Sequence, residues 1–237
     1  VMPAGWDAPS FAFVHIKGSW LNAEPFSRLG KGVNLLHMTV QSYWCECALL
    51  PDGWADAVLI EVDVAGTIAT VTSDTDPGDA DRIGGVVLPG MPNLHSHAFQ
   101  RAAAGLTERR VSGTGVDDSF WTWRQVMHGF VIGLTPEDNQ AIAAQLYVEM
   151  LKAGYTAVGE FHYLHLDPDG KPYADRAEMS HGITSAAVQA GIGLTHLPVL
   201  YSVGGYGGVE PNDGQRRYIL EVEDFLNLVG GLISTHT

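Results

Sequence analysis

The sequence has few basic residues and no long apolar run. Thirteen lysines and arginines stand against 27 aspartates and glutamates, which gives a formal net charge of −14 at pH 7. Because no basic cluster is available to contact phosphates, we expect neither a nucleic acid nor an anionic membrane as a partner. No apolar stretch approaches the roughly 20 residues of a membrane-spanning helix. The first residues also lack the basic and apolar segments of a secretory signal.

Cysteine is scarce. Only Cys45 and Cys47 occur, two positions apart. Such near neighbours rarely pair in a disulfide, and no second pair of cysteines or histidines lies close enough in the chain to complete a zinc knuckle. We therefore expect two reduced thiols on a strand, which is typical of a cytoplasmic protein.

Two common enzyme motifs are missing as well. The sequence has no G-x-S-x-G element, which argues against a serine hydrolase. The glycine-rich segment 202–208 follows an expected strand, but it lacks the G-x-G-x-x-G order of a nucleotide-binding loop. We interpret it as a flexible loop at the end of that strand.

The N-terminal third divides into two parts. Residues 1–37 contain several aromatic side chains but no sustained period of 2 or 3.6 residues, and we leave them unassigned. We favour Met38 as the native start, with 1–37 as upstream sequence; the alternative is a genuine extension that packs its aromatic residues. Residues 38–85 are expected to be part of a small β-sandwich domain, with strands at 41–49, 57–64 and 67–71 and a loop at 72–85.

From Val86 the sequence alternates between expected strands and helices, the pattern of β/α units around a parallel sheet. Thr135-Pro136-Glu137-Asp138 predicts a helix start with a capping box, and Gly154 ends that helix. Further strands are expected at 156–163 and 194–201, and further helices at 175–191 and 215–229. Residues 86–237 therefore predict an α/β fold with about the first three units of a (β/α)8 TIM-type barrel. Since a complete barrel takes roughly 250 residues, we expect the N-terminal part of a larger enzyme.

The strongest candidate site is in the segment Val86 to His97, which reads Val-Val-Leu-Pro-Gly-Met-Pro-Asn-Leu-His-Ser-His. We interpret His95 and His97 as the end of a buried strand that Pro89-Gly90 precedes. Residues two positions apart in a strand point to the same face, so the two imidazoles can bind one metal ion. The alternative is a chance pairing, because a lone His-x-His is common.

Three polar residues are candidates for substrate binding. Gln100 follows the histidines, where its amide could contact a substrate or lie on a helix surface. Arg124 ends the aromatic segment 118–124, whose tryptophans are expected to pack, and its guanidinium suits a carboxylate. Tyr163 ends the second strand, where barrel enzymes place functional groups, although its surroundings also fit a polar loop. We expect His165 to pack or to cap a loop.

Several stretches together resemble the N-formimino-L-glutamate deiminases (formimidoylglutamate deiminases) of the amidohydrolase superfamily. The resemblance covers most of residues 38–229. It is most specific in Asp-Ser-Phe-Trp-Thr-Trp-Arg (118–124) and Glu-Phe-His-Tyr (160–163). The other matching stretches are 48–56, 89–101, 145–156, 197–201 and 214–217.

The resemblance implies hydrolysis of N-formimino-L-glutamate, a small anionic molecule, to N-formyl-L-glutamate and ammonia in histidine degradation. It implies one zinc ion, or iron in its place, held by His95 and His97 together with ligands from later strands. Gln100, Arg124 and Tyr163 match positions that line the substrate pocket, with Arg124 as the carboxylate partner. The full-length protein could form a homodimer.

Some family features are changed or missing. Leu166 and Val203 stand where the family tends to have histidine, which concerns substrate preference. The family's remaining zinc ligands, its proton-transferring histidine and a further substrate arginine have no counterpart here. Because catalytic zinc needs three protein ligands, we expect no deiminase activity from this chain alone. Exposed strand edges also predict poor solubility.

Two other functions stay open. The chain could belong to an amidohydrolase that deaminates a cyclic amidine of the guanine or cytosine type, although Arg124 favours a carboxylate-bearing substrate. It could also be a non-catalytic remnant whose surface binds a partner.

Overall fold

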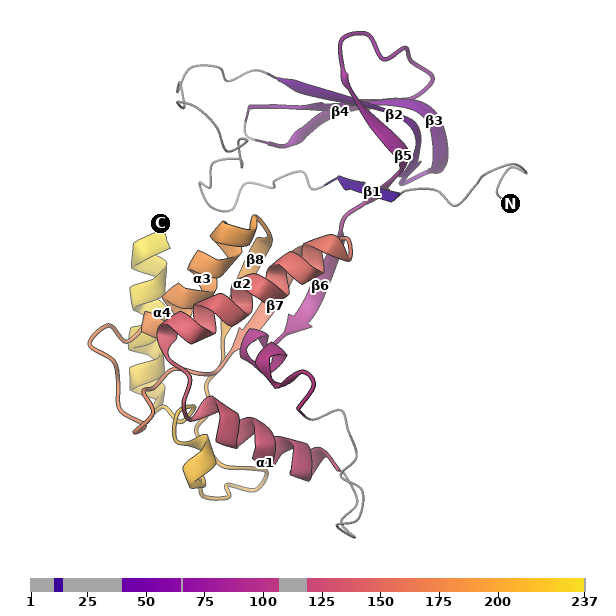
Figure 1. Ribbon diagram of the computed structural model, residues 1–237. Coiled ribbons are helices and arrows are strands. Elements are labelled where there is room, and N and C mark those ends of the chain that lie inside the picture. Colours follow the sequence, from indigo (N-terminus) through magenta and orange to yellow (C-terminus); the bar gives the residue numbers. More distant parts are fainter. Residues whose placement is uncertain (1–10, 15–39, 65, 107–118, 237) are drawn as a thin grey trace. The chain divides into compact units, whose positions relative to one another are not determined.

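The computed structural model describes residues 11–14, 40–64, 66–106 and 119–236. Most of the predicted extension at 1–37 lies outside these ranges. The chain divides into two compact units, which are described separately (Figure 1). The first comprises Val1–Met91 with Gly154–Thr156, and the second comprises Pro92–Ala153 with Ala157–Thr237.

The first unit contains a five-stranded sheet with the strand order β1-β5-β2-β3-β4. Its strands are β1 (Phe11–Val14), β2 (Gln41–Leu50), β3 (Gly53–Val62), β4 (Ile68–Thr72) and β5 (Asp81–Pro89). β2 and β3 form an antiparallel hairpin around a turn at Pro51-Asp52, and β5 returns parallel to β2. The three strands predicted between residues 41 and 71 are thus confirmed, although β3 begins at Gly53 rather than at residue 57.

Alternating side chains form the core of this sheet. In β3, Val58, Ile60 and Val62 are buried, whereas the residues between them are partly exposed. Successive side chains of a strand point to opposite faces, so one face of β3 belongs to a cluster with Cys45 of β2 and Val87 of β5. Both cysteines of the sequence are free thiols, as predicted.

The structure corrects two predictions at the end of this sheet. Residues 72–85 are predicted to form a loop, yet β5 begins at Asp81. The histidine pair is predicted to end a buried strand that Pro89-Gly90 precedes. That strand is β6 (Met91–Ser96), but it is mostly exposed, and it belongs to a different sheet from β5. Gly90 stands between β5 and β6. A Cβ atom at this position would lie 2.2 Å from Thr156 Oγ1, so a residue with a side chain does not fit there. The flanking prolines also lack the backbone donor that a strand ladder needs.

The second unit contains a three-stranded sheet accompanied by helices (Figure 1). The strand order is β6-β7-β8, with β7 at Tyr155–His162 and β8 at Gly193–Pro198. β7 and β8 are parallel. β6 runs in the same direction, because Leu94 lies beside Gly159 and His97 lies beside Phe161. The carboxyl ends of the three strands therefore meet at one edge of the sheet.

The predicted alternation of strands and helices, and with it the mixed α/β class, is confirmed. The helical segments of the described residues are η1 (Ala98–Ala103), α1 (Phe120–Val131), α2 (Pro136–Lys152), α3 (Glu178–Ala190), η2 (Asp213–Gln215) and α4 (Val222–His236). α2 begins with the predicted capping box, in which Thr135 and Asp138 each accept a hydrogen bond from the other's backbone. α3 ends at the predicted Gly191, whose φ is 80°. None of these described helices is long and apolar enough to cross a membrane.

Two predicted boundaries differ from the structure near the C-terminus. The third strand ends at Pro198 rather than at Tyr201. The last helix begins at Val222 rather than at Gln215, which instead ends a short 3-10 helix. The chain between these helices directs Arg217 into the protein interior, so a continuous helix is interrupted by long-range packing.

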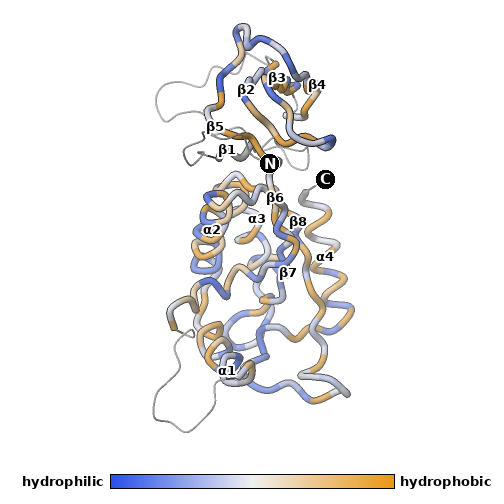
Figure 2. The backbone as a smooth tube through the Cα atoms, turned by 90° about the vertical axis from the view of Figure 1, so that its right-hand side faces the viewer, coloured by the Kyte–Doolittle hydropathy of each residue, from blue (hydrophilic) through white to orange (hydrophobic). Residues whose placement is uncertain are grey.

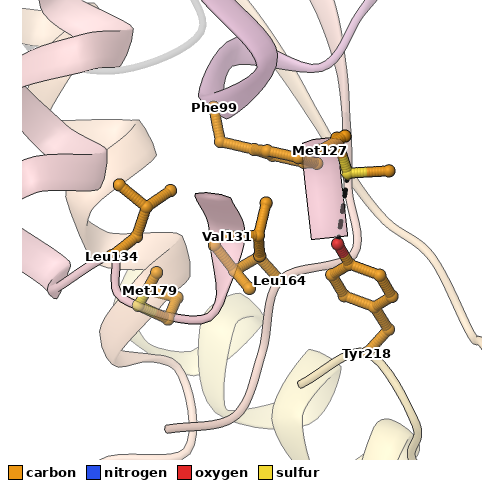
Figure 3. Packing of buried hydrophobic residues seen from close by; sticks show 7 residues of the cluster. All are labelled: Phe99, Met127, Val131, Leu134, Leu164, Met179 and Tyr218. Atoms are coloured by element: carbon orange, nitrogen blue, oxygen red, sulfur yellow. Dashed lines mark hydrogen bonds between the residues drawn. The ribbon is translucent and has the colours of Figure 1, made fainter. Parts of the chain in front are cut away.

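A hydrophobic core joins α1 to the carboxyl ends of the strands (Figure 3). Its buried residues are Phe99, Met127, Val131, Leu134, Leu164, Met179 and Tyr218. They come from η1, α1, α3 and the segments that follow α1, β7 and η2. The hydroxyl of Tyr218 also donates to Met127 Sδ at 3.4 Å. This core fixes α1 beside the edge where the strands end.

α4 packs along the same unit through one apolar face. Figure 2 shows hydrophobic and hydrophilic stretches alternating along this helix. Leu228 and Leu232 are buried in a second cluster with Leu220, whereas Leu226 and Ile233 are exposed. One face of α4 is thus buried, while apolar side chains remain exposed elsewhere on the helix.

Candidate metal-binding active site

The two predicted metal ligands project together from the end of β6. His95 lies in β6, and His97 directly follows it. Their Nε2 atoms are 3.1 Å apart, and their rings meet edge to face with centroids 4.7 Å apart. His95 is exposed and His97 is half-buried. The two imidazoles therefore converge on one side of the strand.

Neighbouring groups hold His97 in a form suited to metal binding. Its Nδ1 lies 2.8 Å from the carbonyl oxygen of Phe161 on β7. A carbonyl can only accept, so Nδ1 carries the proton and Nε2 presents its lone pair. Metal-binding histidines are commonly oriented in this way. Burial lowers the pKa of His97 by more than the bond to Phe161 raises it, so the neutral, ligating imidazole is favoured.

The histidine pair fits two of the ligands of a zinc ion. Tetrahedral zinc, with Zn–N bonds of about 2.0–2.1 Å, places two nitrogen ligands about 3.3 Å apart. This is close to the 3.1 Å between the two Nε2 atoms. Catalytic zinc takes three protein ligands, but within the described ranges no group of three or more histidine, cysteine, aspartate or glutamate side chains could hold a metal. The described residues thus provide a partial ligand set.

Gln100 and Tyr163 lie next to the histidines and contact each other. Gln100 is on η1, and its Nε2 donates to the Tyr163 hydroxyl at 2.9 Å. The Tyr163 ring, just after β7, meets the His97 ring edge to face, with centroids 5.0 Å apart. Burial raises the pKa of Tyr163 to about 12. Its hydroxyl therefore stays protonated at neutral pH and can donate to an oxygen of a bound molecule.

Arg124 reaches the same residues from α1. Its Nη2 donates to the Tyr201 hydroxyl at 3.0 Å, and the Tyr201 and Tyr163 rings are tilted with centroids 6.1 Å apart. The positive charge of Arg124 also opposes the rise in the pKa of Tyr163, as expected for neighbouring groups. The structure therefore brings the three predicted substrate-binding residues together beside His97, at the sheet edge where the strands end.

Tyr201 is a member of this group that the sequence analysis misses. It ends the matching stretch 197–201, but it has no predicted role. Its partner Arg124 is 77 residues away in the chain, and no local spacing indicates that the two side chains meet.

Glu160 is a second missed contributor. It is completely buried on β7, and its Oε1 accepts a hydrogen bond from the backbone N–H of Ala98 at 2.5 Å. This bond fixes the backbone directly after His97. An acidic side chain that directly follows the segment Ala157-Val158-Gly159 of a strand is the signal that points to such a role, because buried carboxyl groups are rare unless they have partners.

The remaining predictions in this region concern packing. His165 is buried, with its Nε2 3.0 Å from the carbonyl oxygen of Val199, so the prediction that it packs is confirmed. Trp123 packs against the core drawn in Figure 3, also as predicted. Asp118 and the side chain of Trp121 lie outside the described residues.

Comparison with known proteins identifies relatives of part of this chain. No protein-family model matches it. The formimidoylglutamate deiminase of Pseudomonas aeruginosa is 56% identical over 190 residues, which cover 80% of this chain and 41% of that protein. A 5-methylthioadenosine/S-adenosylhomocysteine deaminase of Natronomonas pharaonis is 30% identical over 116 residues, which cover 47% of this chain and 25% of that protein. The chain thus spans less than half the length of these curated relatives.

Two solved structures are also similar to this chain. An amidohydrolase from Brucella melitensis has 48% sequence identity and a TM-score of 0.76, and the match covers 82% of this chain and 43% of that one. The atrazine chlorohydrolase of Arthrobacter aurescens TC1, complexed with zinc, has 18% identity and a TM-score of 0.59 over 81% of this chain and 42% of that one. At this identity the second likeness shows a shared fold alone. Sequence and structure together confirm that, over the part it spans, this chain resembles the formimidoylglutamate deiminases of the amidohydrolase superfamily.

Proposed function

We propose that the protein containing this chain hydrolyses N-formimino-L-glutamate to N-formyl-L-glutamate and ammonia. The main support is the grouping of His95 and His97 with Gln100, Arg124 and Tyr163 at one edge of a parallel sheet. The 56% identity to a formimidoylglutamate deiminase supports the same reaction. Each of these side chains suits one part of such a substrate.

His95 and His97 would hold a zinc ion together with further ligands. The zinc complex of the structurally similar chlorohydrolase supports this metal. Zinc supplies a Lewis acid and an activated water for breaking a C–N bond when it is bound. The carbonyl of Phe161 keeps the His97 ring oriented for this role. Iron could replace zinc, because imidazole ligands suit both metals.

Arg124 would bind a carboxylate of the substrate, because a guanidinium can donate two parallel hydrogen bonds to one carboxylate. Gln100 and Tyr163 would orient the same molecule, since an amide and a phenol both donate hydrogen bonds. The chain has a net charge of −14. An anionic substrate therefore needs a local positive group such as Arg124 in order to bind.

We also propose a larger architecture around the site. The three parallel strands would be the first units of a TIM-type barrel in 86–237; β8 is an edge strand of the described sheet and could pair with a further strand. The first sheet would be part of a β-sandwich domain in 38–85. A homodimer and a cytoplasmic location complete the proposal, and two free thiols suit a reducing compartment.

The alternative function is deamination of a cyclic amidine. The 30% identity to a 5-methylthioadenosine/S-adenosylhomocysteine deaminase favours it, but that match covers only 47% of this chain. A nucleobase offers no carboxylate to a guanidinium, so Arg124 favours the glutamate derivative.

Ammonia release by the full-length, zinc-loaded protein separates these functions. We expect turnover of N-formimino-L-glutamate and no turnover of 5′-methylthioadenosine or guanine. His95→Ala and His97→Ala should each lose bound zinc and activity together. His181→Ala, which changes a histidine on α3, is the matched control and should retain both. Turnover of the purine compounds alone would exclude the proposed function.

A further inference from the structure

We infer that Tyr201 is a positioning residue for substrate recognition, because its hydroxyl holds the guanidinium of Arg124. This inference rests on the proposed function and extends it to a residue outside the predicted set. Tyr201 follows β8, whereas Arg124 lies on α1, 77 residues earlier in the chain. The 3.0 Å bond between Arg124 Nη2 and Tyr201 Oη joins these two elements at the candidate site.

The backbone of Tyr201 is fixed where the chain leaves β8. Tyr201 forms a parallel bridge with Ile219, and its carbonyl oxygen accepts a hydrogen bond from the backbone N–H of Leu220 at 3.0 Å. The adjacent Tyr218 is buried in the core (Figure 3). The core therefore anchors the segment that determines where the Tyr201 side chain lies.

The ring of Tyr201 is held by two other tyrosines. Its centroid is 6.1 Å from that of Tyr163 and 5.9 Å from that of Tyr218, and those two rings are 5.0 Å apart. Aromatic rings at such separations stabilise one another. We call Tyr163, Tyr201 and Tyr218 the tyrosine cluster. Two of its hydroxyls accept hydrogen bonds from candidate substrate-binding side chains, Tyr163 from Gln100 and Tyr201 from Arg124.

The Tyr201 hydroxyl restricts the orientation of the Arg124 guanidinium. The five N–H donors of a guanidinium lie in one plane, so a bond to Nη2 restricts the direction in which that plane faces. An arginine that is ordered before the substrate arrives loses less conformational freedom when it binds a carboxylate. Removal of the hydroxyl should therefore weaken binding, while the groups that act on the C–N bond stay unchanged.

The test is Tyr201→Phe in the full-length protein, which removes the hydroxyl and keeps the ring in the tyrosine cluster. We expect binding of the product N-formyl-L-glutamate, measured by titration calorimetry, to weaken about 3- to 10-fold. The KM for N-formimino-L-glutamate should rise by a similar factor, with kcat within about twofold. Tyr206→Phe is the matched control, because Tyr206 is fully exposed, and it should change neither quantity.

A double-mutant cycle tests whether Tyr201 acts through Arg124. In a protein that already contains Arg124→Gln, the change Tyr201→Phe should weaken product binding by less than about 1.5-fold. Unchanged binding in the single Tyr201→Phe variant, or equal weakening in both backgrounds, would overturn the inference. A wild-type protein that releases no ammonia from N-formimino-L-glutamate would overturn the proposed function instead, so the two failures are distinguishable.

Discussion

Among single residues, Arg217 has the most extensive buried hydrogen bonding in the second unit. Its side chain is completely buried. Nε donates to the carbonyl of Leu166 at 2.8 Å, and Nη1 donates to the carbonyls of Val131 at 2.5 Å and Leu134 at 2.8 Å. Val131 is the last residue of α1, and the helix dipole favours a positive charge at that end. Arg217 therefore stabilises the helix that presents Arg124.

Replacement of Arg217 by methionine should lower the free energy of unfolding by about 2–4 kcal/mol, because buried carbonyls lose their donors. Arg216→Met is the matched control. Arg216 makes its bonds to the carbonyls of Pro168 and Asp213 at the surface, so its loss should cost less than about 1 kcal/mol. Urea unfolding measures both variants, and equal losses would contradict the importance of burial.

His162 gives a prediction about pH. Its side chain is completely buried on β7. Burial lowers the pKa of His162 well below the usual value, and the charges of His196, His165 and His97 act in the same direction. Below about pH 6.5 the unfolded chain binds a proton that the folded protein does not bind at His162. Stability should therefore decrease as the pH falls below this value, by up to about 1.4 kcal/mol per pH unit.

Unfolding experiments between about pH 5 and pH 7 test this prediction. His162→Leu should make the decrease shallower, because leucine does not titrate. The wild-type protein in the same buffers is the reference. If the variant loses stability as steeply as the wild type when the pH falls, other buried histidines, such as His128, cause the acid sensitivity.

At the scale of elements, the start of α2 follows a local rule. The capping box of α2 is made by two residues three positions apart, so Thr135→Ala should lower the free energy of unfolding by about 1 kcal/mol. Thr184→Ala, in the interior of α3, is the matched control and should change it by less than about 0.5 kcal/mol, because alanine suits a helix interior. Urea unfolding followed by circular dichroism compares the two. A larger loss at Thr184 would contradict the capping argument.

Strand ends follow less local rules. Val86 to Pro92 is an apolar run, and its period does not reveal that β5 and β6 belong to different sheets. The break depends on the close approach of Thr156 to Gly90, two residues that are far apart in the chain. The start of β5 inside the predicted loop at 72–85 also depends on a distant partner, because Asp81 to Ile83 pair with Tyr43 to Cys45 of β2.

At the scale of the whole molecule, the ligand set determines the expected activity. The histidine pair would supply two metal ligands, and the described part of the chain holds no cluster of three. Since catalytic zinc needs three protein ligands, the purified 237-residue chain should release no ammonia from N-formimino-L-glutamate even when zinc is supplied. The full-length protein, assayed in parallel, is the control. Ammonia release by the chain alone would contradict this ligand requirement.

The sequence by itself determined the features that depend on residues close together in the chain. These are the same-face histidines His95 and His97, the helix start at Thr135 and the alternation of strands with helices, since period and capping act over a few residues. Only the tertiary structure decided which distant groups meet at the site. The bond of Arg124 to Tyr201 joins separate elements, and such contacts arise from the packing of the core and strand edges, which no local spacing specifies.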